Sequence, residues 1–239
     1  MERICEPELM DDPLQARTYA EADFDRSDQA FTERILALRS SCFPPAANGQ
    51  KILDLGCGPG NITFRLAEAL PKANVLGIDG APAMLALAEE RRCNQPARWP
   101  SLRFHQARLP LPAESLAALP PPFAPPYGVI VSNSLLHHLH DPAVLWQAVR
   151  QWAAPGALVV VRDLRRPPNP EALQELVERH AADAPNVLRR DFANSLAAAF
   201  LPEEVEAQLE PAGLTCLKVE TVEDRYLEVR GQLPEASPR

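Results

Sequence analysis

Three features of the chain predict an α/β fold built on a doubly wound, mainly parallel sheet. Short apolar strands alternate with helical segments along most of the 239 residues. The first strand runs into a glycine turn and a helix, and the second strand ends in an acid about twenty residues further on. Such alternation implies helices on both faces of one sheet. A chain of this length suits a single domain over residues 1–239.

The elements are expected in a regular order. Strands are expected at 51–55, 74–78, 102–106, 128–132, 157–162, 216–222 and 226–230. Helices are expected at 13–40, 60–70, 82–93, 141–153, 170–183, 191–200 and 202–211. The dense prolines of 108–126 exclude regular helix or strand over much of that segment, so we expect a loop there.

The turn after the first strand is the most informative motif. Residues 51–61 read KILDLGCGPGN, with glycines spaced G-x-G-x-G and Asp54 two residues before the first of them. A dinucleotide fingerprint would have its last glycine where Asn61 stands. A carboxylate in the turn repels a pyrophosphate, so Asp54 suits a ligand with a positive amino group and no phosphate.

This turn resembles the first motif of the class I S-adenosylmethionine-dependent methyltransferases, an acid, any residue, then G-x-G-x-G. Asp54, Gly56, Gly58 and Gly60 match it. The resemblance implies a Rossmann-like seven-stranded sheet, mainly parallel with an antiparallel last strand. It also implies S-adenosyl-L-methionine as cofactor and transfer of its methyl group to a small-molecule acceptor.

The acid that ends the second strand, Asp79, is expected to hydrogen-bond the ribose hydroxyls of the cofactor. The alternative is that Asp79 caps the helix that follows. Two departures from the family pattern stand nearby: Gln106 where an acid often binds the adenine amine, and Gly128 where an acid often precedes the fourth strand. The remaining cofactor contacts implied by the resemblance are Gly80, Met84, Gln106, Ala107, Asn133 and Tyr19.

Catalytic candidates follow the fourth and fifth strands. Residues 128–141 read GVIVSNSLLHHLHD, which resembles the loop beside the departing methyl group in small-molecule members of the family. A neutral His137 or His138 could act as a general base, and the alternative is a packing role. Adjacent side chains point in different directions, so at most one is expected to face the methyl. Asp163 could orient the acceptor or pair with a neighbouring arginine.

Two helical segments are expected to cover the site. We predict an N-terminal lid over 1–45, in which Tyr19, Asp23 and Phe24 close over the cofactor, or in which the aromatic residues pack on the core. We also predict an inserted cap over 165–200 that shapes the acceptor pocket, with a solvated helix pair as the alternative. Arg190, Phe192 and Tyr19 together would suit an acceptor with an anionic group and an apolar body.

Composition excludes several classes of partner. The net charge of −8 argues against a nucleic-acid partner, and the longest apolar runs are too short to span a membrane. The five cysteines are scattered, which indicates a reducing, cytoplasmic setting without disulfides or a cysteine-bound zinc. A metal-assisted subclass of the family carries two glutamates where Ser134 and His137 stand, so no metal is predicted.

The expected function is therefore methyl transfer to a small molecule by in-line displacement. Two other classes stay open at this point. One is a catalytically silent S-adenosylmethionine-binding regulatory or partner protein, which the missing acid before the fourth strand permits. The other is an NAD-dependent oxidoreductase, against which Asp54 and the glycine spacing argue.

Overall fold

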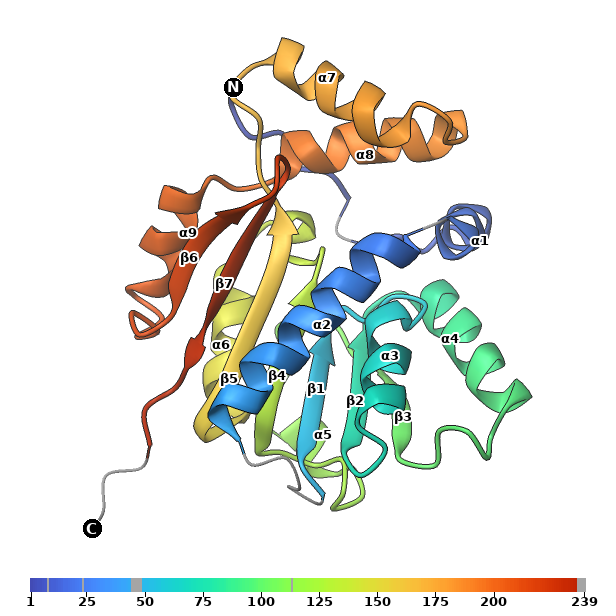
Figure 1. The fold of residues 1–239 in the computed structure, drawn as a ribbon, viewed down its shortest axis with the longest axis vertical. Helices are drawn as coiled ribbons and strands as arrows, with labels where there is room; N and C mark the ends of the chain where they lie inside the picture. The colour runs from blue at the N-terminus through green and yellow to red at the C-terminus, as the bar shows by residue number, and fades with distance from the viewer. Residues whose placement is uncertain (8, 23, 44–48, 113, 236–239) are drawn as a thin grey trace.

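The protein is built on one seven-stranded sheet (Figure 1). The computed structural model describes residues 1–7, 9–22, 24–43, 49–112 and 114–235. The strands are β1 (Lys51–Leu55), β2 (Asn74–Asp79), β3 (Leu102–Gln106), β4 (Tyr127–Asn133), β5 (Ala153–Leu164), β6 (Lys218–Val222) and β7 (Tyr226–Gln232). Their order is β3-β2-β1-β4-β5-β7-β6. β7 runs antiparallel to both of its neighbours, which confirms the predicted mainly parallel sheet with an antiparallel last strand.

Helices cover both faces of this sheet, as the alternating sequence predicts. The helices of the described residues are α1 (Pro13–Glu21), α2 (Asp25–Cys42), α3 (Asn61–Ala69), α4 (Pro82–Asn94), α5 (Glu114–Ala117), the 3-10 turn η1 (Leu136–His138), α6 (Ala143–Trp152), α7 (Pro170–Ala181), α8 (Asn186–Ala198) and α9 (Pro202–Leu209). α2 and α3 pack on the face that looks toward the viewer in Figure 1, and α6 and α9 pack on the other.

Side chains of successive strand residues pack alternately against the helices on the two faces of the sheet. In β1, Ile52 joins the cluster under α2 and α3, whereas Leu53 and Leu55 join the cluster under α6 and α9. All three side chains are fully buried. A strand that is apolar on both faces is typical of a parallel sheet between two helical layers.

Several predicted elements were wrong in extent. The helix expected at 191–200 begins at Asn186, and the strand expected at 157–162 begins at Ala153. The single helix expected at 13–40 is broken into α1 and α2, because Ala22 is extended (ψ 144°) and no sequence signal marks this stop. The break brings the rings of Tyr19 and Phe24 to within 4.9 Å of each other. The loop expected at 108–126 contains the short helix α5, which the prolines on either side leave room for and which buries Leu116.

A third layer lies across the carboxyl ends of the parallel strands (Figure 1). It consists of the N-terminal segment, α1, α7 and α8. The amide of Ile4 donates to the carbonyl of Ala197 over 3.0 Å, which ties the N-terminal segment to α8. α2 instead buries Phe31 and Ile35 in the core, and the lid over 1–45 stays a prediction. Residues 8, 23, 44 and 45 of the expected lid lie outside the described residues.

Within the described residues, no helix has the length and apolar character needed to cross a bilayer.

Candidate functional site

The main cavity of the molecule opens at the carboxyl ends of the parallel strands. It has a volume of about 1270 Å³ and lies beneath the third layer. Its lining comes from the glycine turn after β1, the ends of β2 and β4, the η1 turn, the N-terminal segment and α8. In open α/β sheets ligands bind at this edge, because adjacent loops there diverge to opposite sides of the sheet.

The three glycines of the turn have different roles. All have positive φ, at +70° for Gly56, +53° for Gly58 and +87° for Gly60. A Cβ on Gly56 would lie 2.8 Å from Leu135, and one on Gly60 would lie 2.8 Å from Phe64, so both are required by packing. A Cβ on Gly58 would meet nothing within 4 Å. Gly58 borders the cleft, and its missing side chain leaves that space open to a ligand.

The turn also delivers the start of α3 to the cleft. Gly60 is the N-cap of α3 and offers no side chain to the first amides, and Asn61 and Ile62 line the cavity. Unpaired amides at a helix start carry partial positive charge, which favours an anionic or polar ligand group.

Asp54 lies at the bottom of the same cleft. Its side chain accepts a hydrogen bond of 2.6 Å from the hydroxyl of Thr63 and is 1% exposed. Burial raises the pKa of Asp54 to about 7, against the opposing effect of the Thr63 hydrogen bond. A positive group that enters the cleft would favour the ionised form of Asp54. Because this carboxylate is poorly solvated, its attraction to the positive group would be strong.

Asp79 is held by the backbone around it. One carboxylate oxygen accepts from the amide of Gly58 and the other from the amide of Ala81, each over 2.8 Å. The N-cap of α4 is Ala81, and no side chain caps this helix, so the alternative of Asp79 as the helix cap was wrong. Each carboxylate oxygen of Asp79 has a further lone pair that could bind ribose hydroxyls, and that contact stays a prediction.

The structure gathers most of the other predicted cofactor residues at the cleft. Gly80, Met84, Ala107, Asn133 and Tyr19 all line it. Gln106 does not: it is exposed, and its neighbours Ala107 and Arg108 form the wall instead. The side chain of a strand residue points opposite to that of its neighbour, so a one-residue difference in placement removes Gln106 from the cavity.

The carboxylate of Asp163 binds residues of the loop that follows β4. It is 1% exposed and accepts from the amides of Leu136 at 2.6 Å and Leu164 at 2.7 Å. Its other contact is with Nδ1 of His137 at 2.5 Å. Neither sequence-based interpretation, an acceptor contact or an arginine pair, describes this geometry. Asp163 is a positioning residue that orients the His137 ring.

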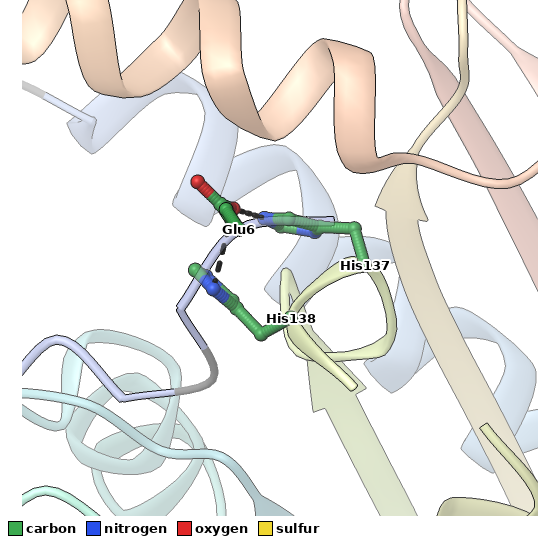
Figure 2. A group of neighbouring side chains, drawn as sticks. All are labelled: Glu6, His137 and His138. Atoms are coloured by element: carbon green, nitrogen blue, oxygen red, sulfur yellow. Dashed lines mark ion pairs between the residues drawn. The ribbon is translucent and has the colours of Figure 1, made fainter. Parts of the chain in front are cut away.

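Both histidines of the run face Glu6 (Figure 2). Oε1 of Glu6 lies 3.5 Å from Nε2 of His137 and 3.3 Å from Nδ1 of His138. The expectation that adjacent rings diverge was wrong, because the tight η1 turn brings the ring centroids to 4.2 Å. Sequence reasoning missed Glu6, since no local motif connects it with His137 and His138, which lie 131 and 132 positions further along the chain.

The protonation preferences of this cluster differ sharply. Burial raises the pKa of Glu6. Burial also lowers the pKa of His138 well below its usual value, and the neighbouring His137 adds to the effect. Burial opposes the charged form of His137 too, but the carboxylate of Asp163 outweighs it and raises the pKa of that ring.

The cap residues contribute in part as predicted. Phe192 lines the cleft together with Tyr19. Arg190 was wrongly placed there: its side chain is 69% exposed and lies 3.4 Å from Asp191, outside the lining. The arginines that do line the cavity are Arg26, Arg108, Arg179 and Arg225.

The chain is similar to known methyltransferases in sequence and in fold. Residues 53–159 match the methyltransferase domain family. A trans-aconitate 2-methyltransferase of Methylobacterium nodulans is 34% identical over 178 residues, which are 72% of this chain and 60% of that protein. One of Streptomyces coelicolor is 32% identical over 176 residues, or 71% of this chain and 52% of that protein. The chain thus spans 60% or less of the length of these relatives.

Solved structures share the fold at low sequence identity. A SAM-dependent methyltransferase from Aquifex aeolicus superposes with a TM-score of 0.61 at 17% identity, covering 93% of this chain and 98% of that one. The plantazolicin methyltransferase BpumL, in complex with a desmethylPZN analog and SAH, gives 0.66 at 14% identity, with 94% and 92% covered. The domain match, the curated relatives and the shared fold agree with the motif after β1, and this chain belongs to the class I S-adenosylmethionine-dependent methyltransferases.

Proposed function

We propose that this chain transfers a methyl group from S-adenosylmethionine to a small molecule that carries a carboxylate. One observation carries the proposal: a single cleft connects the glycine turn and Asp79 with residues of α8. Donor and acceptor would share that space beneath the third layer. The curated relatives are named for trans-aconitate, a carboxylate, and their name supports this acceptor class.

The chain's own residues fit the cofactor. Gly58 leaves room for it, and the start of α3, which no side chain caps, borders the same space with Asn61 and Ile62. The carboxylates of Asp54 and Asp79 line the cleft on the floor side, where the amino group and the ribose hydroxyls would be held. Asp79 is oriented in advance by two backbone amides, so it would lose little freedom on binding.

S-adenosylmethionine supplies an activated methyl group on a sulfonium. The protein then needs mainly to hold the acceptor in line and to exclude water. Orientation of this kind contributes roughly 7–11 kcal/mol in favourable cases. Tyr19 and Phe24, whose rings contact each other at the break between α1 and α2, are placed to close the cleft.

A carboxylate acceptor would need no general base, because it is already ionised at neutral pH. This agrees with the site, in which Asp163 and Glu6 surround the His137 ring. A charge-assisted contact to the acceptor would come from Arg26, which is exposed to the cleft and forms no ion pair with the residues that the structure describes.

The test is transfer of a labelled methyl group from S-adenosylmethionine to a panel of di- and tricarboxylates, trans-aconitate included. Each acid is paired with its fully esterified form. We expect the acids to be methylated and the esters to be inert. Methylation of neutral amines or phenols in preference to every acid would contradict the proposed acceptor class.

Two arginine variants refine the test. Arg26→Ala should raise the KM of the acid by roughly 10-fold, the value of one charge-assisted hydrogen bond, without weakening S-adenosylhomocysteine binding. Arg190→Ala is the matched control, since it removes the same charge from outside the cleft. Equal kinetics in both variants would show that Arg26 does not contact the acceptor.

A further inference from the structure

Glu6, His137 and His138 form a cluster that the proposed methyl transfer does not use. Their three ligand-type atoms all lie within 4.8 Å of one another, at the edge of the cleft (Figure 2). We propose that this cluster binds a divalent transition-metal ion of the Zn²⁺ type. The ligands would be Oε1 of Glu6, Nε2 of His137 and Nδ1 of His138.

The distances fit such an ion. Two ligand atoms that each lie about 2.05 Å from a tetrahedral zinc are about 3.3 Å apart. Oε1 of Glu6 lies 3.3 Å from Nδ1 of His138 and 3.5 Å from Nε2 of His137. Both pairs that include Glu6 therefore already have the spacing of adjacent corners of a coordination tetrahedron, and the two histidine nitrogens lie within 4.8 Å of each other.

The His138 ring presents an unused lone pair to this point. Its Nδ1 is buried and has no hydrogen-bond partner among the described residues. In the tautomer that carries its proton on Nε2, Nδ1 of His138 is an acceptor atom, and it faces the Glu6 carboxylate, which cannot donate to it once ionised. A metal ion would satisfy both atoms.

The His137 ring has the outer partner that metal-bound histidines usually have. Its Nδ1 contacts the carboxylate of Asp163 at 2.5 Å, which leaves Nε2 directed at Glu6. Such a carboxylate fixes the ring orientation and increases the basicity of the ligand nitrogen. Glu6 is itself held by the hydroxyl of Ser195, which donates to Oε1 over 2.9 Å.

The donor set selects among metals. Two imidazoles and one carboxylate suit Zn²⁺ and similar ions better than Ca²⁺ or Mg²⁺, which prefer oxygen. Three protein ligands leave a fourth position, as in catalytic rather than structural zinc sites. The sequence-based prediction of no metal rested only on the residues at 134–138, where two glutamates of a metal-assisted subclass are missing. The structure adds Glu6 from the other end of the chain.

A bound ion would also join two parts of the fold. Glu6 belongs to the N-terminal segment, whereas both histidines belong to the η1 turn after β4. The ion would fasten the N-terminal segment across the cleft. Binding to the folded state alone would then raise thermal stability with metal concentration.

The experiment is a titration of the full, tag-free, chelator-treated chain with Co²⁺, and a competition by Zn²⁺. We expect about one equivalent of Co²⁺ to give visible bands of a four- or five-coordinate site and to raise the melting temperature. Nitrogen and oxygen ligands give no near-ultraviolet thiolate band, so binding at the five cysteines would be recognised.

Glu6→Gln and His138→Ala should each weaken Co²⁺ binding by at least tenfold. His105→Ala is the matched control, since His105 lies on β3 outside the cleft lining. S-adenosylhomocysteine affinity, measured in the same variants, should not change, so a failure of the proposed function would be visible separately. An absent Co²⁺ spectrum in the wild-type chain, or equal binding in all variants, would overturn the metal site.

Discussion

The two sides of the cleft are built in different ways. On the cofactor side, Asp54, the glycine turn and Asp79 lie within 26 residues of one another and act largely through the backbone. On the opposite side, the N-terminal segment meets α8 and η1, which are distant in the chain. Gln15 donates to Asp191 over 2.7 Å and Ser195 donates to Glu6 over 2.9 Å. A local motif describes the first side, whereas contacts between distant segments of the chain describe the second.

The largest expected effect is a loss of cofactor affinity on substitution of Gly58. A control variant distinguishes obstruction of the cleft from backbone strain. Gly58→Val should weaken S-adenosylhomocysteine binding by at least 100-fold, about 2.7 kcal/mol, because its side chain would enter the cleft. Titration calorimetry on folded protein measures this. Gly49→Val is the control: Gly49 also has a left-handed backbone, φ +73°, with nothing within 4 Å of an added Cβ, but lies outside the cleft lining. Equal losses in both variants would make strain the cause.

The next effect concerns Asp79. Asp79→Ala should weaken cofactor binding by roughly 10- to 150-fold, the value of a charged hydrogen bond of about 1.5–3 kcal/mol. Asp79→Asn keeps an acceptor for one backbone amide and should retain more stability than Asp79→Ala. A loss of affinity below threefold in both variants would leave Asp79 only its role of binding the amides of Gly58 and Ala81.

Asp54 makes the stability of the free protein depend on pH. Its pKa is raised from 3.8 to about 7 by burial, so the folded state prefers the protonated form. The associated stability is present below the ordinary pKa and is lost as pH rises through about 7. Asp54→Asn should therefore stabilise the free protein at pH 8 by about 1–2 kcal/mol, while reducing cofactor affinity. Denaturant unfolding at pH 8 and pH 5 measures this. A stabilisation that is as large at pH 5 would exclude ionisation as its cause.

The smallest expected effect tests the opposite side of the cleft. Arg3 donates to the carbonyls of His137 and Leu139, each over 3.0 Å, and its guanidinium stacks on Phe200. Arg3→Ala should loosen the N-terminal segment by about 1 kcal/mol, visible as roughly fivefold faster amide exchange at Ile4. Arg17→Ala, an exposed change on α1, should leave that exchange unaltered. An unchanged rate in Arg3→Ala would show that other contacts hold the segment.

Sequence patterns predicted the sheet and the cofactor side well because both depend on local periodicity and turn chemistry. The strands and most helices are where the apolar pattern places them, and the glycine turn is as the motif implies. The errors occur where packing decides. No residue pattern marks the break between α1 and α2. At the end of β3, packing decides that Ala107 and not Gln106 faces the cleft.

The sequence by itself determined the fold class, the family and the residues of the glycine turn, because these follow from spacing along the chain. Tertiary structure alone decided that Asp163 orients His137, that Arg190 lies outside the cleft and that Glu6 faces both histidines. Those relations join side chains from separate elements. Their geometry depends on how α8, η1 and the N-terminal segment pack together over the sheet, which no single stretch of sequence encodes.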